Sequence, residues 1–286
     1  MNKDYEANAS ENIKNIVAKI KERTAMTAYK LTIIRDSNPD IFDSKFGGVP
    51  YWDMNKEYPV DSQGKKMMLL AQINFTNAKL NNELLPKQGM LQFFFTSEDD
   101  VFGMDWDEPD SQKDFRVIYH ENVDESVTKE DILALDIPIA TDADMDYTPV
   151  MKEAAVDIRE TVTYLGTEDY RFDKVFTEVV KELNGEDISE QGFYDYLHDN
   201  DRDYLYEVCS NDGHWILGYP YFTQSDPREC RDDNYYDTLL FQMDSDMIDS
   251  RDYVLWGDCG VANFFINKEA LKNKDFSRVM YNWDCC

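Results

Sequence analysis

Apolar residues recur every three to four positions in four segments of the chain, and this spacing predicts four amphipathic helices. The helices are expected at residues 10–22, 128–136 and 170–183, with a shorter one beginning after Ser189. Ser10 and Thr128 stand where N-caps are preferred, and Gly185 stands where a helix C-terminus is preferred. These capping residues make the helix boundaries specific rather than approximate.

The remaining apolar segments are short, rich in aromatic and β-branched residues, and separated by Gly, Pro, Asp and Asn clusters, a pattern typical of strands. They cover residues 30–35, 67–75, 90–96, 115–120, 155–164 and 235–243. We therefore predict an α+β fold with antiparallel sheets and a few helices.

Three of these apolar blocks occur twice in the sequence. Gly-Val-Pro-Tyr-Trp at 48–52 recurs as Gly-Tyr-Pro-Tyr-Phe at 218–222, and the Gln-containing block 69–74 recurs at 239–244, both 170 residues later. The Phe-rich block 89–95 recurs at 260–266 with one inserted residue. The order and spacing predict an internal duplication, with two structural repeats at 45–99 and 215–270.

The duplication also predicts how the chain is organised. Residues 1–40 are expected to form an amphipathic helix and a lead-in strand, and 41–145 the first half. Residues 146–286 form the second half, with a helical insertion at about 168–200 and the second repeat copy. We expect all three parts to pack into one compact unit.

Each repeat carries a glutamine within an apolar strand, and such a buried amide needs hydrogen-bond partners. One interpretation is that Gln72 and Gln242 bond to the backbone of the Gly-x-Pro-Tyr turn. The other is that both line a small-molecule or enzymatic cleft between the repeats. The candidate residues of that cleft are Tyr51, Trp52, Gln72, Tyr221, Phe222 and Gln242.

Four segments together resemble the YwqG-like family of bacterial proteins of unknown function. They read S-K-F-G-G-V-P-Y-W at 44–52, L-L-A-Q-I-N-F at 69–75, L-P-K-Q-G-M-L-Q-F-F at 85–94 and F-R-V-I-Y at 115–119. The resemblance covers roughly residues 30 to 283 and implies an α+β fold with two repeats, but no established activity. Asp53 departs from the proline expected after Trp52. Members can lie beside secreted-toxin genes, which implies an immunity role by association only.

Charge restricts the partners that the protein can bind. The 58 Asp and Glu residues outnumber the 29 Lys and Arg residues, so the formal net charge is -29. Such a surface disfavours nucleic acid, whose binding requires cations against phosphates. Only residues 1–35 are basic, with seven cations and four carboxylates. No signal peptide or membrane-spanning stretch is recognisable, so we expect a cytoplasmic protein.

Motifs for familiar enzyme chemistry are missing from the sequence. The chain contains no P-loop, dinucleotide-binding, nucleophile-elbow or zincin string, so no cofactor is predicted and enzymatic activity is disfavoured. Its five cysteines form no C-x-x-C pair and are interpreted as reduced thiols, with no role assigned to Cys285 or Cys286.

Two acidic segments suggest binding. Residues 142–153 place Asp142, Asp144, Asp146 and Glu153 at EF-hand spacing, but Tyr147 occupies the glycine position, so calcium is only a weak candidate. Residues 98–114 combine eight carboxylates with aromatic side chains, including the run Asp105, Trp106, Asp107 and Glu108.

An acidic segment usually forms a solvated surface, but carboxylates around an aromatic residue also suit docking of a basic protein. We therefore expect an acidic binding protein that engages a basic protein partner, of the immunity or toxin-neutralising type. The alternative is small-molecule binding or catalysis in the cleft between the repeats.

Overall fold

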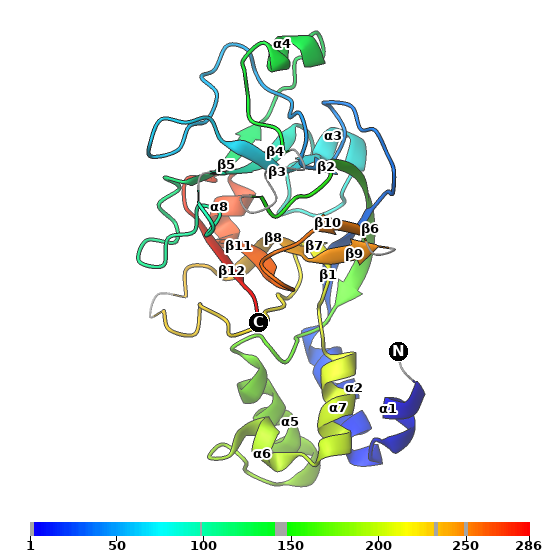
Figure 1. Ribbon diagram of the computed structural model, residues 1–286. Coiled ribbons are helices and arrows are strands. Elements are labelled where there is room, and N and C mark those ends of the chain that lie inside the picture. The colour runs from blue at the N-terminus through cyan, green and yellow to red at the C-terminus, as the bar shows by residue number, and fades with distance from the viewer. Residues whose placement is uncertain (1–2, 98, 141–147, 232–233, 249–250) are drawn as a thin grey trace.

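The computed structural model describes residues 3–97, 99–140, 148–231, 234–248 and 251–286. Within these residues, ten strands pair antiparallel in one sheet, in the order β12-β11-β8-β7-β1-β6-β2-β3-β4-β5 (Figure 1). The strands are β1 (Met26–Ile33), β2 (Lys45–Phe46), β3 (Met68–Asn74), β4 (Met90–Phe95), β5 (Phe115–His120), β6 (Ala154–Thr163), β7 (His214–Ile216), β8 (Thr238–Asp244), β11 (Val261–Ile266) and β12 (Val279–Asp284). A separate two-stranded sheet pairs β9 (Asp246–Ile248) with β10 (Arg251–Val254).

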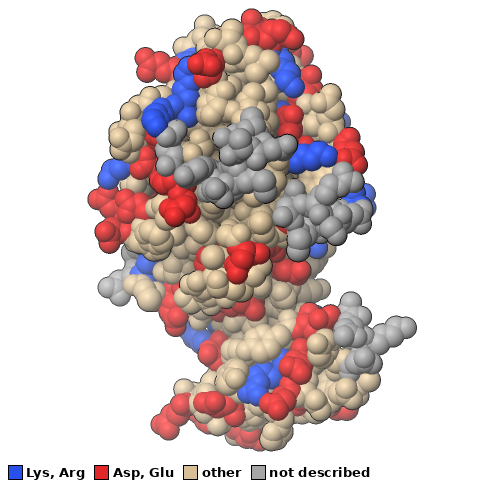
Figure 2. Space-filling model, viewed as in Figure 1, with Lys and Arg blue, Asp and Glu red and all other residues tan. Residues whose placement is uncertain are grey.

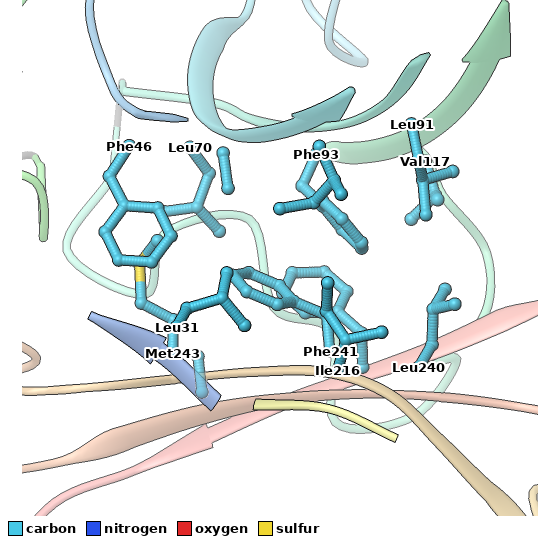
Figure 3. Packing of buried hydrophobic residues seen from close by; sticks show 14 of the residues in the cluster. Leu31, Phe46, Leu70, Leu91, Phe93, Val117, Ile216, Leu240, Phe241 and Met243 are labelled. Atoms are coloured by element: carbon cyan, nitrogen blue, oxygen red, sulfur yellow. The ribbon is translucent and has the colours of Figure 1, made fainter. Parts of the chain in front are cut away.

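The long sheet curves until its two ends face each other, so the structure is close to a barrel. Phe93 of β4 packs against Phe241 of β8 and Phe264 of β11, with ring centroids 4.7 and 4.8 Å apart. Figure 3 shows the two layers of apolar side chains meeting between the opposed strands. Strands β3, β4, β8 and β11 are almost fully buried, so both of their faces are covered and the simple alternation of buried and exposed positions is lost.

Five helices form a separate lobe below the β-sheet body in Figure 1. They are α1 (Lys3–Asn8), α2 (Glu11–Thr24), α5 (Phe172–Asn184), α6 (Gly192–Tyr196) and α7 (Asp199–Val208). The apolar faces of α2 and α5 meet in the core of this lobe, and Arg23 of α2 pairs with Glu182 of α5. The basic N-terminal helix therefore packs within its own molecule.

Three short helices lie on the β-sheet body: α3 (Phe75–Ala78), α4 (Lys129–Leu133) and α8 (Lys268–Lys272). Helix α4 begins after Thr128, whose side chain forms a capping box with Asp131, and α2 begins after Ser10, which accepts a hydrogen bond from the Ile13 amide. Both predicted N-caps are thus confirmed. Gly185 ends α5 in the left-handed conformation, as predicted.

The predicted α+β class with antiparallel sheets is confirmed, and most predicted strands lie within a few residues of the observed ones. Strand β1 begins four residues earlier than expected, at Met26. The helical region extends beyond residue 200 because α7 continues to Val208, and β12 was not predicted. In the part of the chain that the structure describes, no helix combines the length and the apolar character needed to cross a bilayer.

Candidate functional site

The acidic run at 105–108 lies in a loop that connects β4 and β5. Asp105 shapes this turn, because its Oδ1 accepts hydrogen bonds from the amides of Asp107 (2.9 Å) and Glu108 (3.0 Å). Trp106 is 71% exposed, and Asp107 and Glu108 are also exposed. The loop therefore presents an indole to solvent between carboxylates.

This loop is fixed against the far end of the sheet, β12. The indole of Trp283 donates to the Val101 carbonyl (2.7 Å), and the Tyr281 amide donates to the Pro109 carbonyl (2.9 Å). Phe102 packs its ring 5.1 Å from that of Trp283. Contacts at both ends of the turn hold it in place, so Trp106 is presented by an ordered segment rather than by a free loop.

Acidic side chains also dominate the wider surface. Figure 2 shows carboxylates spread over both the β-sheet body and the helical lobe, with fewer cations between them. We call residues 99–114 the Trp106 loop. Two of its carboxylates are already in ion pairs: Glu108 with Lys113, and Asp110 with Arg278. Asp105 and Asp107 make no ion pair among the described residues, so they contribute uncompensated negative charge beside Trp106.

The six predicted cleft residues fall into two sets, one from each repeated block. The first set, Tyr51, Trp52 and Gln72, lies deep in the β-sheet body. The Gln72 Oε1 accepts from the Tyr51 amide (3.1 Å), and its Nε2 donates to the carbonyls of Ile41 and Asp43 (both 2.7 Å). Gln72, Tyr51 and Trp52 are all at most 2% exposed. The amide of Gln72 therefore holds the Gly-x-Pro-Tyr turn against strand β3.

The second set, Tyr221, Phe222 and Gln242, repeats this arrangement 170 residues later. The Gln242 Oε1 accepts from the Tyr221 amide (2.8 Å), and its Nε2 donates to the carbonyls of Asn211 (2.9 Å) and Gly213 (2.8 Å). Each turn also contains a glycine at positive φ, +73° at Gly48 and +91° at Gly218, a conformation that side chains disfavour.

The structure places the two sets in different hydrophobic clusters. Tyr51 and Trp52 pack with β3 and β4, whereas Phe222 packs with β8 and β11. Backbone groups occupy both glutamine amides, and none of the six residues lines the cavity beside Arg171 that is described below. Ligand binding by these six residues stays a prediction.

His120 is buried beside Tyr51 and Trp52, and the sequence did not predict its burial. His120 ends β5, and its Nε2 lies 3.0 Å from the Gln92 Oε1, with the Tyr51 and Trp52 rings 5.3 and 5.1 Å away. Burial lowers the pKa of His120 to about 4, so the ring is neutral near pH 7. A buried neutral imidazole here supports the packing of the turn.

The weak calcium prediction cannot be placed as a set, because Asp142, Asp144 and Asp146 lie outside the described residues. Glu153 is described, and its Oε1 accepts from the Nζ of fully buried Lys45 at 2.7 Å. Burial lowers the pKa of Lys45, although the hydrogen bond to Glu153 acts in the opposite direction. Among the described residues, no group of three or more His, Cys, Asp or Glu side chains is arranged to hold a metal ion.

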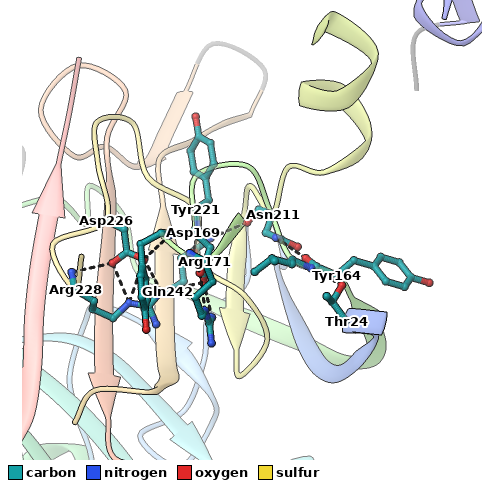
Figure 4. Close-up of polar contacts among 11 residues, drawn as sticks. Thr24, Tyr164, Asp169, Arg171, Asn211, Tyr221, Asp226, Arg228 and Gln242 are labelled. Carbon is teal, nitrogen blue, oxygen red and sulfur yellow. Dashed lines mark hydrogen bonds and ion pairs between the residues drawn. The ribbon is translucent and has the colours of Figure 1, made fainter. Parts of the chain in front are cut away.

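A buried ion-pair network, also not anticipated from the sequence, links the helical lobe to the β-sheet body (Figure 4). Arg228 donates to Asp226 (2.6 Å) and to Asp169 (3.0 Å), and Arg171 pairs with Asp169. Burial alone would raise the pKa of Asp169, but the hydrogen bonds from Arg171 and the charge of Arg228 hold it below its ordinary value. Two arginines therefore balance two carboxylates.

Arg171 also reaches a cavity of about 390 Å³ at the junction of the lobe and the body. The guanidinium lies 5.5 Å from the Tyr170 ring and 5.4 Å from the Tyr219 ring, which restrict its position. Lys268 lines the same cavity together with the polar side chains of Thr27, Asn82, Asp237 and Thr238. Two cations and one carboxylate line this cavity, which is unusual in so acidic a protein.

These features define an acidic protein with a curved antiparallel sheet, an ordered loop carrying an exposed tryptophan, and a separate helical lobe. Residues 44–285 match DUF1963, a domain of unknown function. The chain therefore belongs to the DUF1963 family, which fits the expected resemblance to a family of unknown function. The YwqG-like name stays a prediction. A comparison with curated proteins finds no match.

Proposed function

We propose that this protein binds a basic protein partner through the Trp106 loop, residues 99–114. The observation that carries the proposal is the 71% exposure of Trp106 on a turn that is held at both ends. Tryptophan is the residue type most enriched among binding hot spots, and an ordered loop loses little entropy when it binds. The neighbouring carboxylates favour a cationic surface on the partner and speed association.

Substitution of Trp106 tests the proposal. Because an interface tryptophan buries a large apolar area, Trp106→Ala is expected to weaken partner binding by about 2 kcal/mol or more, roughly 30-fold. The triple variant Asp105→Asn, Asp107→Asn, Glu108→Gln is expected to reduce the association rate and its dependence on salt. Partners are captured from lysate at low salt, identified by mass spectrometry, and their affinities measured by calorimetry.

Matched variants separate the loop from general charge and general exposure. Glu57→Gln, Glu83→Gln, Glu125→Gln removes three exposed charges elsewhere, and Tyr194→Ala removes an aromatic side chain of the helical lobe that is 57% exposed. Both controls should retain binding. Equal loss in the loop variants and the controls, or capture unaffected by Trp106→Ala, contradicts the proposal.

The equivalent hydrogen bonds of Gln72 and Gln242 support an internal duplication of the sheet. In addition, Gln92 donates to the Tyr51 carbonyl (2.7 Å) and Asn263 donates to the Tyr221 carbonyl (2.9 Å), at corresponding positions of β4 and β11. Matching side chains thus bond to matching backbone atoms. We infer that two copies of one unit supply the two ends of the sheet.

A second candidate function is binding of a small anionic molecule in the cavity beside Arg171. The observation that favours it is that two cationic side chains, Arg171 and Lys268, line the same cavity in an otherwise acidic protein. Arg171 uses two of its five N–H groups for Asp169, which leaves donors for a carboxylate or phosphate. This candidate stands beside the predicted inter-repeat cleft, which remains a separate prediction.

Thermal unfolding with added anions tests the second candidate. Inorganic phosphate or succinate is expected to raise Tm with concentration, because a ligand that binds only the folded state stabilises it. Lys268→Glu should abolish the rise, because the reversed charge repels an anion. Lys272→Glu changes an exposed charge on the same helix and should leave it intact. A rise that is identical in both variants indicates a general salt effect and rejects this site.

A further inference from the structure

Two exposed cysteines that are distant in the sequence lie side by side. The Sγ atoms of Cys259 and Cys286 are 3.1 Å apart, and both residues are exposed. Cys259 lies in the turn after β10, and Cys286 follows β12. Of the remaining thiols, Cys209 is buried, Cys230 is exposed and Cys285 is partly buried.

Glycines in the turn after β10 allow this approach. A Cβ atom at Gly260 would lie 2.0 Å from the Asp284 carbonyl oxygen, so only glycine permits the turn to touch the end of β12. The Gly260 amide donates to the Trp256 carbonyl (2.7 Å), and the Trp256 ring packs beside Trp283, with centroids 5.9 Å apart. The backbone on both sides of the thiol pair is therefore held by buried contacts.

Cys285 is separated from this pair by the direction of its side chain. A Cβ atom at Gly257 would lie 2.8 Å from the Cys285 Sγ, so that thiol is placed against Gly257. The Sγ of Cys286, by contrast, lies against the Sγ of Cys259. Of these three neighbouring cysteines, Cys259 and Cys286 are therefore the pair whose sulfur atoms are in contact.

We propose that Cys259 and Cys286 form a reversible disulfide with a small-molecule disulfide as the oxidant. The thiolate of one cysteine attacks the oxidant, forms a mixed disulfide and releases one small thiol. The thiolate of the second cysteine then attacks the protein sulfur of that mixed disulfide and releases the other small thiol. Two protein thiols are oxidised, and one oxidant molecule is reduced to two thiols.

The geometry needs little adjustment for this reaction. The Sγ separation exceeds the about 2.05 Å of a disulfide by roughly 1 Å, which a rotation of two exposed side chains can close. Exposure also gives the oxidant access to both sulfurs. The hydrogen bond to Cys286 raises the pKa of Cys259, and the charge of Asp258 acts in the same direction, so exchange is slower than at an activated thiol.

The disulfide would stabilise one edge of the sheet. Strand β12 is the last strand of the ten-stranded sheet, and its outer side has no strand partner among the described residues. A bond from Cys286 to Cys259 closes a loop that contains β11, α8 and β12, and so restricts the unfolded chain. Fraying of β12 becomes slower because its end is covalently held.

The test oxidises the full chain with oxidised glutathione and maps the peptides by mass spectrometry. We expect one intramolecular Cys259–Cys286 linkage, loss of two titratable thiols, and a Tm increase of about 5 °C that dithiothreitol reverses. Hydrogen exchange of residues 279–284 should slow in the oxidised form. These changes should be absent from Cys259→Ser and Cys286→Ser.

Serine variants of the other cysteines are the matched controls. Cys230→Ser and Cys285→Ser should retain both the linkage and the Tm increase, and circular dichroism of the reduced forms checks that every variant folds. Persistence of five free thiols in the oxidised wild type overturns the proposal. A linkage between Cys285 and Cys286, or one between two molecules, overturns it as well.

Discussion

Replacing Arg228 with alanine is expected to lower the free energy of unfolding by about 3–5 kcal/mol. Arg228 is 6% exposed and is the only side chain in the described network that bonds both Asp226 and Asp169. Its removal leaves two buried carboxylates with less compensation, and Asp226 loses its ion pair. Urea unfolding followed by circular dichroism measures the change.

A surface ion pair provides the comparison. Arg159 pairs with Asp157, but its side chain is 81% exposed, so Arg159→Ala should cost no more than about 1 kcal/mol. A loss below about 1 kcal/mol for Arg228→Ala would show that the buried network does not hold the helical lobe against the sheet. Because the network joins the two regions, we also expect the lobe to unfold at lower urea in this variant.

Replacing Gln72 with leucine is expected to destabilise the protein by about 3 kcal/mol or more. Leucine fills a similar volume but leaves the Tyr51 amide and the carbonyls of Ile41 and Asp43 without the amide that bonds them. Each buried polar group left unsatisfied costs about 1–3 kcal/mol. Equilibrium urea unfolding gives the value.

Gln242, which makes the equivalent hydrogen bonds, offers a direct check on this explanation. Gln242→Leu removes the equivalent three hydrogen bonds and should cost a comparable amount. Gln63→Leu, at an exposed position, should change stability by less than about 0.5 kcal/mol. A small effect at Gln72 together with a large one at Gln242 would contradict equivalent roles for the two glutamines.

Local features of the fold were predictable from the sequence wherever neighbouring residues determine them. Ser10, Thr128 and Gly185 marked helix ends correctly because a cap satisfies backbone groups within three or four residues of itself. Most strands were found from short apolar segments. Strand β12 was missed. It pairs with β11 and bonds to the Trp106 loop, and its own sequence does not indicate these contacts.

The candidate site was predictable only in part. Composition singled out Trp106 and its acidic neighbours, but not the contacts that hold their loop on β12. Val101 and Trp283 are 182 residues apart, and no local pattern reports such a pairing. The cavity beside Arg171 was missed for the same reason, because its lining comes from several separate segments of the chain.

The sequence alone therefore determined the α+β class, the capped helices, the acidic character and the recurrence of the Gly-x-Pro-Tyr and Gln blocks. These properties depend on residue types and on spacings of a few residues. Only the tertiary structure decided that both glutamines bond to the backbone, that Arg228 joins the lobe to the sheet, and that Cys259 meets Cys286. Those outcomes arise because the curved sheet brings distant segments within bonding distance, which is a property of the folded chain as a whole.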